Sequence, residues 1–110
     1  MSNVPFVEVE QLRDMLAAPQ PAIVIDVREP WENELCSLPG SKLIPLGSLP
    51  QRLAEIPKDR PVVMHCHHGG RSGRAVAYLM EQGYTNAFNL KGGIHAWSQR
   101  IDPSVKTYSG

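Results

Sequence analysis

Short apolar runs alternate with segments of helical periodicity along this 110-residue chain, and that alternation constrains its fold more than any other feature. Four runs are of strand type and largely apolar on successive residues: 22–27, 42–46, 61–66 and 86–90. Strands that are apolar on both faces are typical of a parallel sheet covered on both sides by helices. The alternation therefore predicts an α/β fold, a three-layer α/β/α domain with a mainly parallel central sheet.

The segments beside these runs are expected to be helical at 9–16, 29–35, 49–56, 72–82 and 93–100. Ser48 is a typical N-cap for the third helix, and Pro57 ends it. The fourth pattern is the clearest, because an apolar stripe precedes Gly83, which suits the left-handed position after a helix. The length fits one domain, expected at 6–105, with a short C-terminal tail at 106–110.

Composition narrows the possible partners. Eleven basic residues balance eleven acidic ones, and no basic stripe indicates nucleic acid. No apolar run reaches the about 18 residues that a membrane span needs. The first five residues do not read as a signal peptide, and two cysteines are too few for a disulfide scaffold. We therefore expect a cytoplasmic protein with no nucleic-acid or membrane partner.

The most informative segment is the one that follows the third apolar run. In open α/β sheets the functional crevice lies at the carboxyl ends of the strands, which here points to Asp26, Arg28 and Cys66. After Cys66 comes a short loop that leads into a helix: His67, His68, Gly69, Gly70, Arg71 and Ser72. Backbone N–H groups of such a loop converge into an anion cradle, which stabilises a thiolate. A buried core cysteine is the plain alternative.

Four motifs in order give this chain its resemblance to a known family. Residues 26–29 follow the first strand, 38–41 precede Ile44 and Pro45, 66–72 form the loop, and 90–93 precede Trp97. Together these segments resemble the motifs of single-domain rhodaneses, the thiosulfate sulfurtransferase family, over most of the chain. Residues 36–37 depart from the common family pattern, which has Gly-His where this chain has Cys-Ser. We expect Cys36 to be a plain buried thiol, not a resolving cysteine.

The resemblance implies a mechanism. Cys66 takes the outer sulfur of a donor such as thiosulfate, and the resulting persulfide passes its sulfur to a thiol or to cyanide. The loop residues 67–72 are then expected to bind substrate and persulfide, with Asp26 and Arg28 as an ion pair that supports them. No cofactor is implied. The implied partners are a small sulfur donor and a thiol acceptor, and a protein acceptor of sulfur is compatible with the scheme.

Other functions remain open at this point. Similar folds carry cysteine-dependent phosphatases and arsenate reductases, whose loops place five residues between cysteine and arginine. Four lie between Cys66 and Arg71 here, which favours a sulfur atom over a phosphoryl group. A non-catalytic persulfide carrier is the second alternative.

Several neighbouring side chains also need an interpretation. Residues as close in sequence as His65, His67 and His68 cannot easily all point at one ion, so no metal site is expected. His67 and His68 are expected to be exposed in the loop and His65 to lie inside its strand. Three further side chains are expected away from the chemistry: Arg74 as a surface charge, and Trp31 and Trp97 as packing residues.

Overall fold

The computed structural model describes residues 4–108; residues 1–3 and 109–110, the last two of the expected tail, lie outside the described part. Its centre is a five-stranded sheet in the order β1-β5-β4-β2-β3, in which every pair of neighbours is parallel. The strands are β1 (Phe6–Val7), β2 (Ile23–Asp26), β3 (Lys42–Leu43), β4 (Val62–His65) and β5 (Ala87–Leu90). The parallel sheet predicted from the apolar runs is confirmed.

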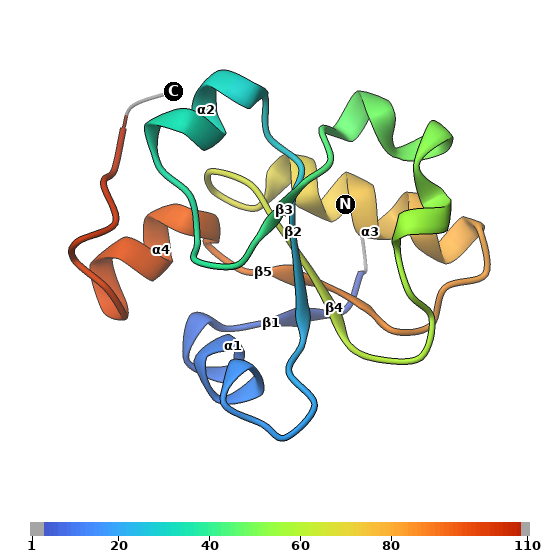
Figure 1. The fold of residues 1–110 in the computed structure, drawn as a ribbon, viewed down its shortest axis with the longest axis horizontal. Helices are drawn as coiled ribbons and strands as arrows, with labels where there is room; N and C mark the ends of the chain where they lie inside the picture. Colours follow the sequence, from blue (N-terminus) through green and yellow to red (C-terminus); the bar gives the residue numbers. More distant parts are fainter. Residues whose placement is uncertain (1–3, 109–110) are drawn as a thin grey trace.

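Helical segments cover both faces of the sheet (Figure 1). One face packs against α3 (Gly70–Glu81) and two 3₁₀ segments, η1 (Leu46–Gln51) and η2 (Leu53–Glu55). The other face packs against α1 (Val9–Leu16) and α4 (Gly93–Arg100). The short α2 (Pro30–Leu35) follows β2 at the carboxyl edge. None of the helices among residues 4–108 is long and apolar enough to cross a membrane.

Strand register places the candidate residues at one edge. Asp26 pairs with His65 in neighbouring strands, so the residues that follow each strand, Arg28 and Cys66, leave the sheet on the same side. On the other side of β4, Met64 pairs with Asn89 of β5. The carboxyl ends of β2 and β4 therefore lie at the same edge of the sheet, as expected.

The prediction of an α-helix at 49–56 is wrong. This stretch forms η1 and η2 instead, with hydrogen bonds between residues three apart, such as Arg52 N–H to the Leu49 carbonyl at 3.0 Å. Because η1 begins at Leu46, a continuous α-helix over this stretch would need a hydrogen bond from the N–H of residue 50 to the Leu46 carbonyl, and Pro50 has no N–H to donate.

One strand and the start of one helix also differ from the expectations. The strand β1 was missed, because two residues are too short for a periodic pattern; it pairs with β5 at Asn89 and Leu90. Helix α3 begins at Gly70, two residues before the expected start at Ser72. Gly69 is its N-cap with φ of 116°, a left-handed conformation that favours glycine.

Candidate functional site

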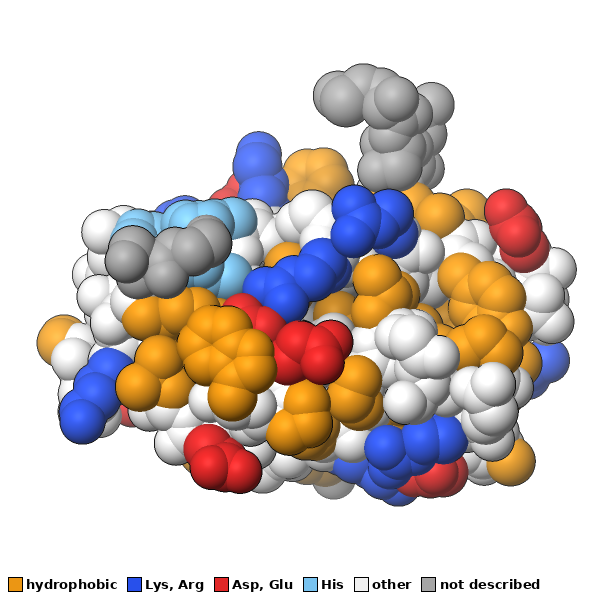
Figure 2. Space-filling view, turned by 90° about the horizontal axis from the view of Figure 1, so that it is seen from above, with side chains coloured by type: hydrophobic (Ala, Val, Ile, Leu, Met, Phe, Trp, Pro, Cys, Tyr) orange, Lys and Arg blue, Asp and Glu red, His pale blue; other side chains and the backbone are white. Residues whose placement is uncertain are grey.

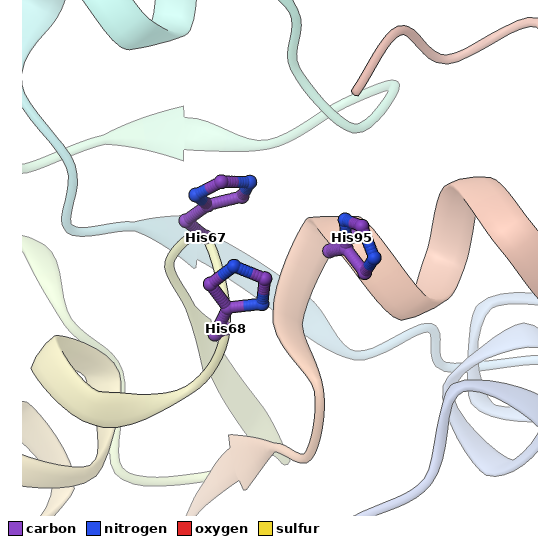
Figure 3. A group of neighbouring side chains, drawn as sticks. All are labelled: His67, His68 and His95. Atoms are coloured by element: carbon purple, nitrogen blue, oxygen red, sulfur yellow. The ribbon is translucent and has the colours of Figure 1, made fainter. Parts of the chain in front are cut away.

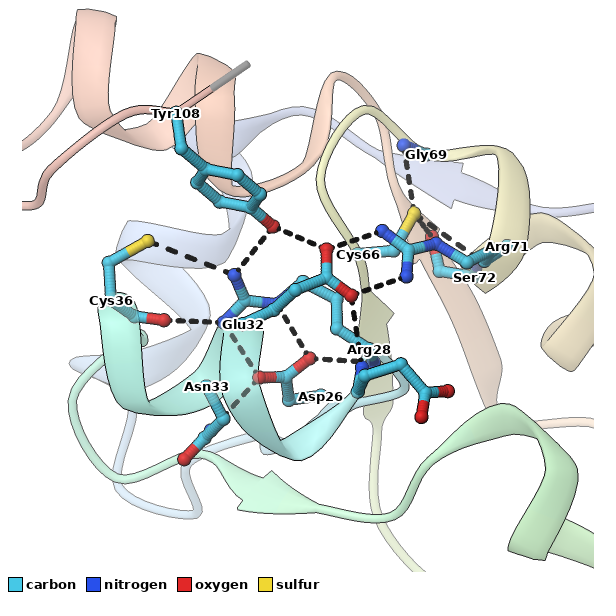
Figure 4. Close-up of polar contacts among 11 residues, drawn as sticks. Asp26, Arg28, Glu32, Asn33, Cys36, Cys66, Gly69, Arg71, Ser72 and Tyr108 are labelled. Atoms are coloured by element: carbon cyan, nitrogen blue, oxygen red, sulfur yellow. Dashed lines mark hydrogen bonds and ion pairs between the residues drawn. The ribbon is translucent and has the colours of Figure 1, made fainter. Parts of the chain in front are cut away.

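Cys66 follows β4 directly, and its residue is only 2% exposed. Its sulfur lies within reach of three donors (Figure 4): the Gly69 N–H at 3.1 Å, the Ser72 N–H at 3.4 Å and the Ser72 hydroxyl at 3.3 Å. Two of the donors are backbone groups at the N-terminus of α3, where the helix dipole also favours negative charge. The predicted anion cradle is present and is centred on Sγ.

Asn89 of β5 orders this cradle, a role that no motif in the sequence predicted. Its Nδ2 donates to the Gly69 carbonyl at 3.1 Å, and its Oδ1 accepts from the Ser72 hydroxyl at 2.5 Å. One amide therefore holds both ends of the turn around Cys66. The available signal was a polar residue inside an otherwise apolar strand.

The first turn of α4 closes the cradle from behind. The Ile94 N–H donates to the Cys66 carbonyl at 2.9 Å, and the His95 N–H donates to the His67 carbonyl at 3.1 Å. Gly93 has φ of 62°, and a Cβ there would lie 2.5 Å from the carbonyl oxygens of both Cys66 and His67. The second glycine of the 90–93 motif is therefore required by close approach of two backbones.

Arg71 lies in the predicted loop, but its charge is paired. Its guanidinium donates two hydrogen bonds to the Glu32 carboxylate of α2, at 2.6 and 2.9 Å. The bonds from Arg71 hold the pKa of Glu32 at about 2, and Glu32 in turn raises the pKa of Arg71. Glu32 is buried and was missed from sequence, because an acidic residue in a short helix resembles an ordinary surface charge.

The expected ion pair between Asp26 and Arg28 is confirmed, with both side chains fully buried and 2.8 Å apart. Burial alone would raise the pKa of Asp26, but hydrogen bonds from Arg28 and Asn33 outweigh it and hold that pKa below its usual range. Arg28 also donates to the Cys36 carbonyl at 2.6 Å, so it supports the wall behind the pocket. As expected, Cys36 is a buried, unbridged thiol.

Tyr108, from the segment expected to be a tail, is part of this wall. Its hydroxyl accepts a hydrogen bond from Arg28 at 2.9 Å and donates one to Glu32 at 2.7 Å. Burial raises its pKa to about 12, so the hydroxyl keeps its proton at neutral pH. The ring stacks on His67, with centroids 3.9 Å apart and planes at 8°. A lone tyrosine near a chain end carries no sequence signal for this role.

The burial of the histidines differs in part from the expectation. His68 is exposed as predicted, but the expected exposure of His67 is wrong, because Tyr108 covers its ring. His65 lies inside β4 as predicted, where burial lowers its pKa to about 4 and keeps it neutral.

The two tryptophans, both expected to be packing residues, also differ in burial. The packing role expected for Trp31 is wrong, because 60% of that residue is exposed at the pocket rim, edge-on to Tyr108. Trp97 is a buried packing residue as predicted. Arg74 is exposed as predicted, and it lies at the pocket rim.

These groups surround a pocket of about 510 Å³. Figure 2 shows a face of the molecule on which histidine, basic and acidic side chains lie close together. The charged lining of the pocket is balanced, with two carboxylates and two guanidinium groups: Glu29, Glu32, Arg71 and Arg74. The remaining lining residues are Trp31, Cys66, His67, His68, Gly70 and Tyr108. The arrangement suits a nucleophilic thiolate that receives a small group and keeps it among N–H donors.

Comparisons with known proteins agree with this geometry. The family model of the rhodanese-like domain matches residues 8–100. A sulfurtransferase of Allochromatium vinosum is 41% identical over 99 residues, which cover 90% of this chain and 92% of that protein. The thiosulfate sulfurtransferase GlpE of Stutzerimonas stutzeri is 34% identical over 77% of this chain and 78% of that protein.

A solved structure is similar over nearly the same span. The rhodanese-like domain protein of Staphylococcus aureus superimposes with a TM-score of 0.82 at 30% identity, over 96% of this chain and 99% of that one. Some curated relatives are longer, and the chain spans 26 to 38% of their length.

Proposed function

The chain belongs to the family of rhodanese-like domains, and we propose that it is a sulfurtransferase that carries sulfur as a persulfide on Cys66. The observation that carries this proposal is the set of three donors aimed at Sγ by Gly69 and Ser72. Such donors stabilise a sulfur anion without an oxidant or a metal ion.

In the first step, the Cys66 thiolate forms a bond to the outer sulfur of thiosulfate. The sulfur–sulfur bond of the donor breaks, and sulfite leaves with the electron pair. The product is a Cys66 persulfide anion whose terminal sulfur extends from Sγ into the pocket. The N–H groups at the start of α3 point at Cys66 Sγ. They therefore favour negative charge on the thiolate before the transfer and on the persulfide after it.

In the second step, an acceptor thiolate attacks the terminal sulfur and leaves as a new persulfide, and Cys66 returns as thiolate. Cyanide reacts in the same way and becomes thiocyanate. Because the enzyme alternates between two covalent states, we expect ping-pong kinetics. The pocket of about 510 Å³ has room for a small thiol beside Cys66.

The balanced charge of the pocket bears on the donor. Arg71 is committed to Glu32, so Arg74 is the guanidinium that remains for an anionic donor among the described lining residues, in addition to the backbone cradle. We therefore propose that the pocket accepts persulfides of small thiols as well as thiosulfate. The same commitment of Arg71 argues against a phosphatase, whose loop arginine must bind phosphoryl oxygens.

The experiment is intact mass spectrometry after incubation with thiosulfate, for wild type, Cys66→Ala and Cys36→Ala, with thiosulfate:cyanide turnover measured in parallel. We expect one added sulfur atom and turnover in wild type and Cys36→Ala, and neither in Cys66→Ala. A sulfur adduct without turnover would identify a carrier in place of an enzyme. Absence of the adduct in wild type, or its presence in Cys66→Ala, would overturn the proposal.

A further inference from the structure

Three histidines lie close to one another (Figure 3), and two of them, His67 and His68, line the Cys66 pocket. His67 and His68 come from the loop after β4, and His95 comes from the first turn of α4. Each offers a ring nitrogen, and these nitrogens all lie within 4.8 Å of one another. The ring centroids are 4.0 Å apart for His67 and His68, and 4.9 Å apart for His68 and His95.

Backbone contacts bring these rings together, so their proximity does not depend on the position of exposed side chains alone. The His95 N–H donates to the His67 carbonyl at 3.1 Å, and Gly93 allows α4 to approach that carbonyl closely. The three residues differ in exposure: His67 is buried, His95 half-buried and His68 exposed. The cluster therefore has a fixed inner ligand and an open outer side through which an ion can enter.

We propose that His67, His68 and His95 form a binding site for a divalent transition-metal ion of the zinc type. Imidazole nitrogen is a preferred ligand of zinc, copper and nickel, and no carboxylate belongs to the cluster, which disfavours magnesium and calcium. Tetrahedral zinc at its usual bond lengths sets its nitrogens roughly 3.4 Å apart. Rotation of the exposed His68 and the half-buried His95 toward His67 supplies that contraction.

His65 does not belong to the cluster, because it is enclosed within β4. His95 does belong to it, although it is distant in sequence, because the packing of α4 brings it to the loop. Three protein ligands leave one coordination position open, as in zinc sites that bind a further small ligand.

This site has a consequence for the proposed chemistry. His67 and His68 line the pocket that leads to Cys66, whereas His95 does not. An ion held by the three rings lies at the entrance to the pocket and hinders the sulfur donor. Metal binding and sulfur transfer should therefore exclude each other.

The direct test is titration of the full chain with Co²⁺, followed by its visible absorbance, and with Zn²⁺ by calorimetry. Both titrations use a Cys66→Ala background, so that the nucleophilic thiol cannot supply a ligand. We expect one ion per chain. Adding His95→Ala or His68→Ala should weaken metal binding at least about tenfold, since loss of a residue that only orients a metal ligand already costs about 10–100-fold in affinity. Gln99→Ala, an exposed change one turn further along α4, is the matched control.

Two outcomes would overturn the proposal: no binding in the Cys66→Ala background, or equal affinity in His95→Ala and in the Gln99→Ala control. A second measurement uses chains that retain Cys66. Relative to the metal-free rate of each variant, Zn²⁺ should inhibit sulfur transfer by wild type and by Gln99→Ala more strongly than sulfur transfer by His95→Ala. Because the titration needs no sulfur transfer, failure of the proposed function would leave its result interpretable.

Discussion

Glu32 accepts two hydrogen bonds from Arg71, of 2.6 and 2.9 Å, and so joins α2 to the first turn of α3 beside the Cys66 pocket. The pair is bidentate, the geometry in which a guanidinium and a carboxylate interact most strongly. Tyr108 adds a third bond to the same carboxylate at 2.7 Å, and the hydroxyl of Tyr108 accepts from Arg28. The mouth of the pocket therefore depends on one buried acidic side chain.

Because folding lowers the pKa of Glu32, we predict that the folded chain loses a defined part of its stability in acid. Its pKa is about 2 in the folded chain against 4.5 as the ordinary value, chiefly because of Arg71. A carboxyl whose pKa is lowered by folding stabilises the fold fully above its unfolded pKa, and that contribution disappears as pH falls through 4.5 toward 2. Glu32→Gln should therefore cost about 1 to 3 kcal/mol at pH 7 and lose less than wild type on acidification.

Urea unfolding between neutral pH and pH 2 checks this prediction. Glu34→Gln, an exposed change in the same helix, is the control and should follow wild type. Parallel acid profiles for wild type and Glu32→Gln would show that the pair with Arg71 does not act in this way.

The buried pair of Asp26 and Arg28 makes a second prediction. Arg28 is fully buried and binds Asp26, the Cys36 carbonyl and Tyr108, so Arg28→Met alone leaves a buried carboxylate without its counter-ion. Removing one partner of such a pair costs about 3 to 5 kcal/mol. The double variant Asp26→Asn/Arg28→Met should lose less than the sum of the two single changes.

Equilibrium unfolding of the two single variants and the double variant measures this coupling. Arg13→Met, an exposed change on α1, should leave stability within about 0.5 kcal/mol of wild type. Strict additivity of the two buried changes would contradict the interaction.

Local patterns in the sequence were sufficient for four of the five strands, for four of the expected helices and for the loop that follows Cys66. Apolar runs and glycine positions are local signals, and they specify a strand or a turn without reference to the rest of the chain. The same holds for Gly69, whose left-handed conformation is a property of its own backbone.

The parts that sequence reasoning missed are side chains whose role depends on distant contacts. Glu32, Asn89 and Tyr108 meet the site only after helices and sheet have packed, through contacts that span 17 to 76 residues. His95 is similar, because α4 carries it to His67. The 3₁₀ turns at 46–55 were missed for another reason: apolar spacing resembles a helix there, while Pro50 withholds the N–H that a helix needs.

We predict that alanine is tolerated at Gly47 but not at Gly93. A Cβ at Gly93 would lie 2.5 Å from two backbone oxygens, of Cys66 and His67, and its φ is 62°. Gly93→Ala should therefore destabilise the chain by about 2 to 5 kcal/mol, from left-handed strain together with displaced backbone. Gly47→Ala is the matched control, because its Cβ would meet no heavy atom within 4 Å. Thermal unfolding of both variants checks the prediction, and equal losses would contradict the close approach of α4.

Ser72 offers the sharpest test of the cradle, because its hydroxyl can be removed while its N–H stays. The hydroxyl lies 3.3 Å from Cys66 Sγ and 2.5 Å from Asn89 Oδ1, so its single proton is available to one of them at a time. When Sγ becomes a thiolate or a persulfide, we expect that proton to turn toward the sulfur. Ser72→Ala should therefore slow persulfide formation about ten- to a hundredfold, somewhat less than loss of a dedicated oxyanion donor, because two backbone donors remain.

Rapid-mixing mass spectrometry with thiosulfate measures the rate of sulfur addition directly. Ser48→Ala, which removes a hydroxyl from η1 away from the pocket lining, should leave the rate unchanged. Asn89→Ala frees the Ser72 proton but also releases the Gly69 carbonyl, so it should slow the reaction by disordering the turn. A normal rate in Ser72→Ala would mean that the N–H groups alone hold the sulfur, and the hydroxyl would then serve only to anchor Asn89.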